Sequence, residues 1–361
     1  MIDITTDLSG SGPAPADAPD STPAATRADP AAGADADTQT ARNRGRGAHY
    51  PWQIPLLGWR DVLLRVYHES HADNLTLIAA GMAFYAMLSV APALAFIISL
   101  YGLLVSPEQL QAQMLVLSSY LPGDAQVLVQ DQLAELVTTQ TRNLGWSLGV
   151  SATISLWSAS RAMKSLFMGL NAVYDEIETR PWIIVMGQSL LFTLIGIVVL
   201  LLVISTMAIL PALLAYLPLN EAGEVLFHTS SFLIVSGVVL GGLAVLYRFG
   251  PSRTRPRWRW VAVGALVAWL AWGLASAGLS WYVGNFDSYQ RTYGALGAVA
   301  ILLMWFFVSA YAVLIGGELN AELEHQTEID STVGEARPMG ERGALMADTV
   351  GHVPSWRRTG T

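Results

Sequence analysis

The sequence predicts an all-α, polytopic membrane protein with six transmembrane helices and with its N and C termini in the cytoplasm. Only 13% of the 361 residues are charged, whereas 53% are hydrophobic, and soluble domains usually carry about twice that share of charge. Six apolar runs without charged residues are each long enough to cross a bilayer. Eighteen of the 20 Lys and Arg residues fall in alternate connections between these runs. Basic flanks are retained on the cytoplasmic side, so this alternation predicts the orientation and an inner (plasma) membrane location.

The chain before the first span has two parts. Residues 1–48 are rich in Ala, Pro and Asp and poor in large apolar residues, which predicts a disordered tail. In the stretch 52–71, Leu56, Trp59 and Leu63 recur at helical spacing with charged residues between them. This pattern predicts an amphipathic helix that lies in the membrane interface. A short soluble helix packed on the protein's own loops is the alternative interpretation.

The transmembrane domain is expected over residues 49–325. Its spans are predicted at about 76–105, 144–168, 183–212, 226–248, 260–284 and 293–318. Backbone groups find no water in the bilayer core, so these segments are expected to be helices. The external loop 107–143 contains two short amphipathic patterns, which either cover the outer mouth of the bundle or only shield the loop backbone. Residues 326–361 are polar and are expected to form a second disordered tail.

The second span carries the strongest candidates for a binding site. A stripe of small residues recurs every three or four positions: Ser151, Ser155, Ser158, Ala162, Ser165 and Gly169. Such a stripe either allows close helix packing or gives a cavity a polar lining. Arg161 and Lys164 follow at the end of the span, where a charge marks a ligand path or a paired network. The alternative for both is snorkelling toward cytoplasmic phosphates.

Further candidate binding residues lie where the second and last spans end. Asn171, Tyr174 and Arg180 belong to a polar stretch that predicts a helix end and a tight turn. Glu318 ends the otherwise uncharged last span, and Asn320 follows it. We expect Glu318 to form a buried ion pair with Arg161 or Lys164.

The connection between the fourth and fifth spans contains five arginines: Arg248, Arg253, Arg255, Arg257 and Arg259. Because the tract is short and lies between two spans, anionic lipid headgroups on the cytoplasmic face are the expected partner rather than nucleic acid. Orientation of the protein in the membrane could also account for these charges.

No catalytic constellation is visible, so we expect no enzyme activity, no cofactor and no bound metal. The chain has no cysteine, and its histidines are not grouped with acids at metal-ligand spacing within a span. Gly237 and Gly241 would suit contact between helices of one bundle or of two copies, so a homo-oligomer is possible.

Three stretches resemble the YihY/virulence factor BrkB family of bacterial inner-membrane proteins. They are AAGMAFYAMLSVAP, WSASRAMKSLFMGLNAVYDEIETR and YVGNFDSYQRTYGALGAVAILLMWFFVSAYAVLIGGELNAELE. The resemblance covers roughly residues 55–325 and implies a six-helix fold. Some members carry an old "ribonuclease BN" label, but a metal-dependent nuclease needs clustered His and acidic ligands in an aqueous site, which this sequence does not show.

These features favour a transporter or exporter of an amphipathic anionic substrate, such as a lipid or a precursor of the cell envelope. Pro92 and Pro211 add to this interpretation, because proline breaks can open backbone groups toward a cavity. The alternative is a membrane scaffold that does not transport and that organises envelope proteins through its tails.

Overall fold

The computed structural model describes residues 43–104, 144–214, 221–285 and 295–352, all within one compact unit that covers residues 41–361. The fold is all-helical, and no β-strand occurs in these ranges. The elements are η1 (Pro51–Gln53), α2 (Leu56–Ala72), α3 (Leu75–Leu104), α6 (Leu144–Val173), α7 (Trp182–Leu214), α8 (Glu221–Phe249), α9 (Trp258–Asn285), α11 (Ala295–His325) and α12 (Leu345–Asp348). The predicted external loop 107–143 lies outside the described residues.

Five of the described helices are long and apolar enough to span a membrane, namely α3, α7, α8, α9 and α11. Helix α6 has 30 residues and at about 1.5 Å per residue is long enough to cross. It is not among the five, because serines and two cations dilute its apolar residues. The sixth span and the orientation of the termini therefore remain predictions. Helix α3 continues through Pro92, so the expected break there does not occur.

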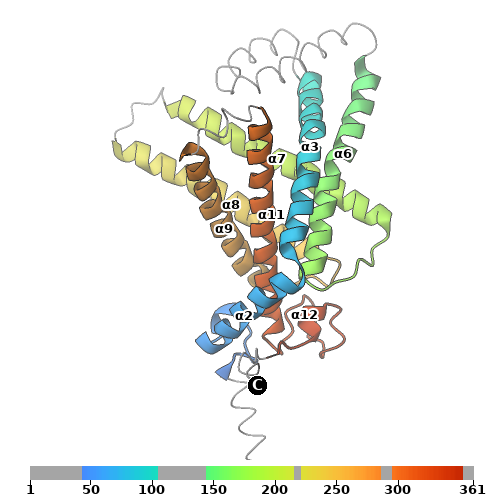
Figure 1. Ribbon diagram of the computed structural model, residues 1–361, viewed down its shortest axis with the longest axis vertical. Helices are drawn as coiled ribbons and strands as arrows, with labels where there is room; N and C mark the ends of the chain where they lie inside the picture. The colour runs from blue at the N-terminus through green and yellow to red at the C-terminus, as the bar shows by residue number, and fades with distance from the viewer. Residues whose placement is uncertain (1–42, 105–143, 215–220, 286–294, 353–361) are drawn as a thin grey trace, which may run out of the picture. The chain divides into compact units, whose positions relative to one another are not determined.

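Helix α11 packs against α2, α3, α6, α9 and α12, while α7 packs mainly on α6 and α8 mainly on α9. Helix α6 also packs along α3 (Figure 1). Two glycines bring α11 and α9 together, because a Cβ atom on Gly264 would lie 2.0 Å from the carbonyl oxygen of Gly316. The side chain of Asn320 fastens the same crossing, since its Oδ1 accepts the Gly264 N–H at 2.8 Å. Small residues at a crossing let two backbones approach closely.

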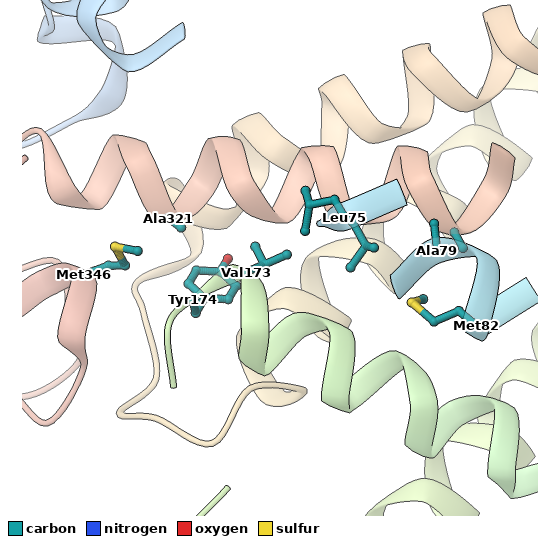
Figure 2. Packing of buried hydrophobic residues seen from close by; sticks show 9 residues of the cluster. Leu75, Ala79, Met82, Val173, Tyr174, Ala321 and Met346 are labelled. Atoms are coloured by element: carbon teal, nitrogen blue, oxygen red, sulfur yellow. The ribbon is translucent and has the colours of Figure 1, made fainter. Parts of the chain in front are cut away.

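A buried apolar cluster joins the ends of four helices. Figure 2 shows Leu75 of α3, Val173 and Tyr174 at the end of α6, Ala321 of α11 and Met346 of α12 in this cluster. The side chain of Tyr174 is fully buried. The cluster fixes how far along their axes α6 and α11 contact each other. This position determines which polar side chains of the two helices are close enough to interact.

The polar segment after α11 packs against the rest of the protein, so the prediction of a disordered tail is wrong for residues 326–352. Thr327 and Ser331 are buried, and Arg342 is buried with its guanidinium on the carbonyl oxygens of Glu328 and Ala347. The main-chain N–H of Val333 also donates to the carbonyl oxygen of Arg255 at 3.0 Å. Hydrogen bonds to backbone groups replace apolar burial here, and a composition rule that counts apolar residues does not detect them.

The last residues of the expected N-terminal tail are also ordered. Ala48 is buried, and the side chain of Thr327 donates to its carbonyl oxygen at 2.8 Å. Arg44 pairs with Asp61. The disordered tail predicted over 1–48 is therefore wrong for residues 43–48, while residues 1–42 lie outside the described ranges.

Helix α2 turns Asp61 and Arg65 inward, whereas Arg60 and several large apolar side chains point outward. Arg65 is buried, pairs with Glu322 and donates to Gln326 Oε1 at 2.7 Å. Leu56 and Tyr67 are exposed, by 88% and 62% of their surface. The face that packs on α11 thus combines these polar contacts with apolar packing of Val62 and Val66. The exposed face has the apolar character that the predicted interfacial position requires.

Candidate anion-binding site

A cavity of about 690 Å³ lies between α3, α6 and α7. This volume falls in the range of small-molecule sites. The lining is mainly apolar, with Met82 and Tyr85 from α3, Trp157 from α6, and Trp182 and Met186 from α7. Five polar side chains interrupt it, namely Ser160, Arg161, Lys164, Ser165 and Ser189. The cavity is therefore suited to a ligand that is largely apolar but carries a polar end.

Arg161 and Lys164 give the cavity a net positive charge. Both line it, both are exposed, and neither forms an ion pair with any residue that the structure describes. The guanidinium of Arg161 lies 5.0 Å from the centroid of the Trp157 ring, which orients it by a cation–π contact. Charges near the end of a membrane span often mark a ligand path or a paired network.

The serine hydroxyl groups that line the cavity are not free to donate a hydrogen bond to an anion. Ser160, Ser165 and Ser189 donate their hydroxyl protons to carbonyl oxygens of their own helices, at 2.7, 2.8 and 2.7 Å. Each hydroxyl then presents only acceptor lone pairs to the cavity. Within this lining, only Arg161 and Lys164 could offer a positive charge to an anion.

A second, smaller cavity of about 360 Å³ continues along α6. It shares Trp157 and Met186 with the first cavity, and its other lining residues include Phe96, Ile154 and Leu190. It contains no charged lining residue. A cationic compartment is thus followed by an apolar one, which is the arrangement that the headgroup and hydrocarbon chain of an amphiphile need.

Part of the small-residue stripe of α6 serves close helix packing, and part of it lines the larger cavity. A Cβ atom on Gly169 would meet Met82 Sδ at 2.9 Å and Leu314 at 3.1 Å, so the end of the stripe allows close packing on α3 and α11. Ser165 and Gly169 also line the larger cavity. The predicted binding residues Ser151, Ser155 and Ser158 are not among the lining residues of either cavity.

The expected ion pair between Glu318 and Arg161 or Lys164 is wrong. Glu318 is fully buried, and its carboxylate oxygens have no hydrogen-bond partner among the described residues. Gly317 packs at the level of Val173. Arg161 lies 12 residues before Val173 on the same helix, or about 18 Å along its axis, so the cation and the carboxylate stand at different levels.

Asn171 and Arg180 lie in a second group, where the α6–α7 connection meets the α8–α9 connection. Asn171 accepts the Ser252 N–H at 2.8 Å and donates to Glu178 at 3.0 Å. Arg180 pairs with Glu178 at 2.7 Å and donates to the Gly250 carbonyl oxygen at 2.9 Å. The hydrogen bonds that the Glu178 carboxylate accepts from Arg180 lower the pKa of Glu178 to about 2.

The turn that starts this connection is a helix-terminating motif. The N–H groups of Asp175 and Glu176 donate to the carbonyl oxygens of Ala172 and Asn171, at 3.0 and 2.8 Å, in the pattern of a Schellman motif. Asp175 adopts a left-handed conformation with φ of +51°, where glycine is the usual residue. The predicted helix end and tight turn are confirmed.

The five arginines at the α8–α9 connection all contact the protein itself, and for Arg255 this contact is the ring of Phe249, 4.9 Å from its Cζ atom. Arg253 pairs with Glu324, Arg248 donates to the Pro256 carbonyl oxygen, and Arg257 donates to the Thr332 carbonyl oxygen at 2.9 Å. Arg259 lies 4.3 Å from the Tyr50 ring centroid. Sequence reasoning did not find these partners, because Glu324 and Thr332 lie 71 and 75 residues away along the chain. Thr332 also belongs to the segment that was expected to be disordered. Arg255 is exposed.

Comparison with known proteins identifies the family. The model of the virulence factor BrkB family matches residues 66–339. This chain belongs to the BrkB family. BrkB-family membership agrees with the helical fold and with the resemblance in the first, second and last predicted spans.

The similarity to known relatives extends over about 70% of this chain and most of each relative. The chain is 30% identical over 277 residues to the putative ribonuclease-like protein YfkH of Bacillus subtilis, covering 73% of this chain and 93% of that protein. It is 26% identical to a UPF0761 membrane protein of Tolumonas auensis, covering 73% and 83%, and 26% identical to one of Alteromonas mediterranea, covering 70% and 83%. No solved structure matches the chain. The chain is thus an integral membrane protein of the BrkB and UPF0761 group.

Proposed function

We propose that the protein binds an amphipathic anion between α3, α6 and α7 and moves it across or out of the inner membrane. The observation that carries the proposal is the position of Arg161 and Lys164, two cations without a carboxylate partner among the described residues, in a cavity of about 690 Å³. An acidic phospholipid or a precursor of the cell envelope has the matching chemistry.

The adjoining apolar cavity supports an amphiphile over a small polar anion. A headgroup held by Arg161 and Lys164 would place its chain against Trp157 and Met186, which line both cavities. Burial of apolar area contributes about 25 cal/mol per Å², so the chain would add affinity that an inorganic anion lacks. The exposed surface of Ile154 gives such a chain contact with the surrounding lipid.

The test is lipid movement by the purified full-length chain in liposomes. We expect a fluorescent phosphatidylglycerol to cross the bilayer faster with the protein present, whereas a fluorescent phosphatidylcholine does not. The double variant Arg161→Gln/Lys164→Gln should reduce the rate by at least about tenfold, since each charge-assisted hydrogen bond is worth about 1.5–3 kcal/mol. Arg60→Gln removes an exposed cation of α2 outside the cavity and serves as the matched control.

Two outcomes would refute this function. The proposal fails if the wild-type protein binds and moves no anionic lipid. It also fails if the Arg161→Gln/Lys164→Gln protein retains the wild-type rate.

The scaffold alternative depends on free tails, and residues 326–352 are packed on the protein. Deletion of residues 1–40 separates the two functions, because a scaffold that acts through this tail loses activity and the transporter keeps it.

A nuclease function has less support than transport. The name of YfkH describes that protein as ribonuclease-like. In the described part of this chain, no group of three or more His, Cys, Asp or Glu side chains is placed to hold a metal ion. We therefore propose no nuclease activity.

A further inference from the structure

A second cavity with a different chemistry lies among the polar connections. It has a volume of about 410 Å³ and is formed by the α6–α7 connection, the α8–α9 connection and the segment that precedes α12. Its lining includes Arg180, Arg248, Ser252, Arg253, Thr254 and Arg255. Four of these residues are arginines and none is acidic. The hydrophobic character of the first cavity is absent here.

Two of the four arginines form ion pairs with carboxylates that do not themselves line the cavity. Glu178 pairs with Arg180 at 2.7 Å, and Glu324 pairs with Arg253 at 2.5 Å. Arg248 and Arg255 have no such carboxylate among the described residues. The cavity therefore keeps about two uncompensated positive charges.

The two unpaired guanidinium groups both lie near the ring of Phe249. The Cζ atom of Arg248 lies 5.5 Å from the centroid of Phe249, and that of Arg255 lies 4.9 Å from it. Like charges that share a ring repel each other. An anion between them removes that repulsion and accepts hydrogen bonds from both.

Buried donors in the cavity wall also lack acceptors. Nε of Arg248, and Nε and Nη1 of Arg253, are buried without a hydrogen-bond partner in the described part of the chain. An unsatisfied buried donor costs about 1–3 kcal/mol, and more when it is charged. Hydroxyl groups of Ser252 and Thr254 stand beside these donors and could also donate to an anion.

We propose that this cavity is a phosphate-binding site that is separate from the amphiphile cavity, with Arg248 and Arg255 as its principal donors. Arginine matches tetrahedral phosphate oxygens with paired N–H groups. A free phosphate compound and the phosphomonoester headgroup of a lipid share this chemistry. The site does not depend on the amphiphile cavity, because the lining residues of the two cavities are different.

The experiment uses the full-length chain in nanodiscs of phosphatidylcholine, titrated with inorganic phosphate at constant ionic strength. We expect saturable binding, seen as ³¹P NMR line broadening and as a rise in melting temperature. Arg255→Gln should weaken binding at least about tenfold. Arg255 is exposed and donates no hydrogen bond to a described residue, so this variant should fold. Arg248→Gln is the second variant.

Arg337→Gln is the matched control, because Arg337 is exposed and does not line the cavity. It should leave the affinity for phosphate unchanged. Equal weakening by Arg337→Gln and Arg255→Gln would show general charge attraction and overturn the proposal. Absence of saturable binding in both the phosphate titration and the lipid experiment below would also overturn it.

A second set of nanodiscs that contain phosphatidic acid distinguishes the two sources of phosphate. If the site takes a headgroup, phosphatidic acid blocks the phosphate titration and is retained by the wild-type protein but not by Arg255→Gln. If the site takes a free compound, phosphate binds equally well in both kinds of nanodisc. Either result supports the site, and neither depends on lipid transport, so failure here is distinct from failure of the proposed function.

Discussion

The guanidinium of Arg253 and the carboxylate of Glu324 form an ion pair from which solvent is excluded. The distance from Nη2 to Oε1 is 2.5 Å, and the two side chains are 1% and 0% exposed. Ser331 donates to the second carboxylate oxygen at 2.6 Å, and the Arg253 guanidinium lies 4.3 Å from the centroid of the Tyr174 ring. One arginine thus connects the α8–α9 connection to α6, α11 and the C-terminal segment.

Removal of one partner of this pair should destabilise the protein strongly. Arg253→Met leaves the Glu324 charge buried without a cation, and such single losses cost about 3–5 kcal/mol. The double variant Arg253→Met/Glu324→Leu should recover most of that loss, because no isolated charge remains. Unfolding in detergent by denaturant measures both values. A stable single variant would contradict the assignment.

The crossing of α9 and α11 should not tolerate a methyl group. Gly264→Ala would place Cβ 2.0 Å from the Gly316 carbonyl oxygen, and overpacking of this kind costs about 1–3 kcal/mol or more. Gly278→Ala on the same helix has no atom within 4 Å of the new Cβ and should leave the melting temperature unchanged or slightly higher. Equal effects of the two substitutions would exclude close packing as the cause.

The pH dependence of stability should contain a contribution from Asp73, between α2 and α3. Burial, followed by repulsion from Asp175 and Glu69, raises the pKa of Asp73 from 3.8 to about 6. The folded state therefore prefers the protonated carboxyl, and the destabilisation appears as the pH rises from about 4 through about 6. Asp73→Asn should raise the melting temperature above pH 6 and have little effect at pH 4. A gain of the same size at both pH values would argue against this origin.

The left-handed residue at the end of α6 should favour glycine. A left-handed conformation costs an L-residue about 1–2 kcal/mol, and less for Asp. We expect Asp175→Gly to raise stability by about 1 kcal/mol and Asp175→Ala to lower it. Asp175→Asn removes the charge but retains tolerance of this conformation. If Asp175→Asn alone gives the whole gain, charge repulsion rather than backbone strain is the cause.

The predicted orientation can be tested by cysteine labelling, because the chain contains no cysteine. Arg255→Cys places a thiol at an exposed position of the α8–α9 connection. A maleimide that cannot cross membranes should label it only after the cells are permeabilised, whereas Arg142→Cys in the predicted external loop should be labelled in intact cells. The reverse result would invert the orientation.

The sequence predicted the helices well, because they follow from local rules. Five predicted spans are helices of membrane-spanning length and hydropathy. Arg161 and Lys164 were chosen because charges among apolar residues need a special environment, and both line the cavity. The apolar compartment beside them needed residues from three helices and could not be seen in one segment.

Long-range polar contacts could not be predicted. The partner of Glu318 was chosen by charge alone, but the level of a residue in the bundle depends on where the helices cross. Gly264 and Gly316 set the α9–α11 crossing, whereas the sequence drew attention to Gly237 and Gly241, which have no neighbouring atom within 4 Å. The ordered C-terminal segment escaped detection because its buried residues, such as Thr327 and Arg342, are polar.

The pairing of Arg65 with Glu322 has a consequence for biogenesis. The two residues are separated by 257 positions, so α2 leaves the ribosome long before the carboxylate that receives its guanidinium has been synthesised. The neighbouring Val62 and Val66 likewise await Leu319 and Leu323. Until the last helix is inserted, α2 lacks this part of its docking surface, and a nascent chain cut short before that point carries an arginine whose acceptor was never made.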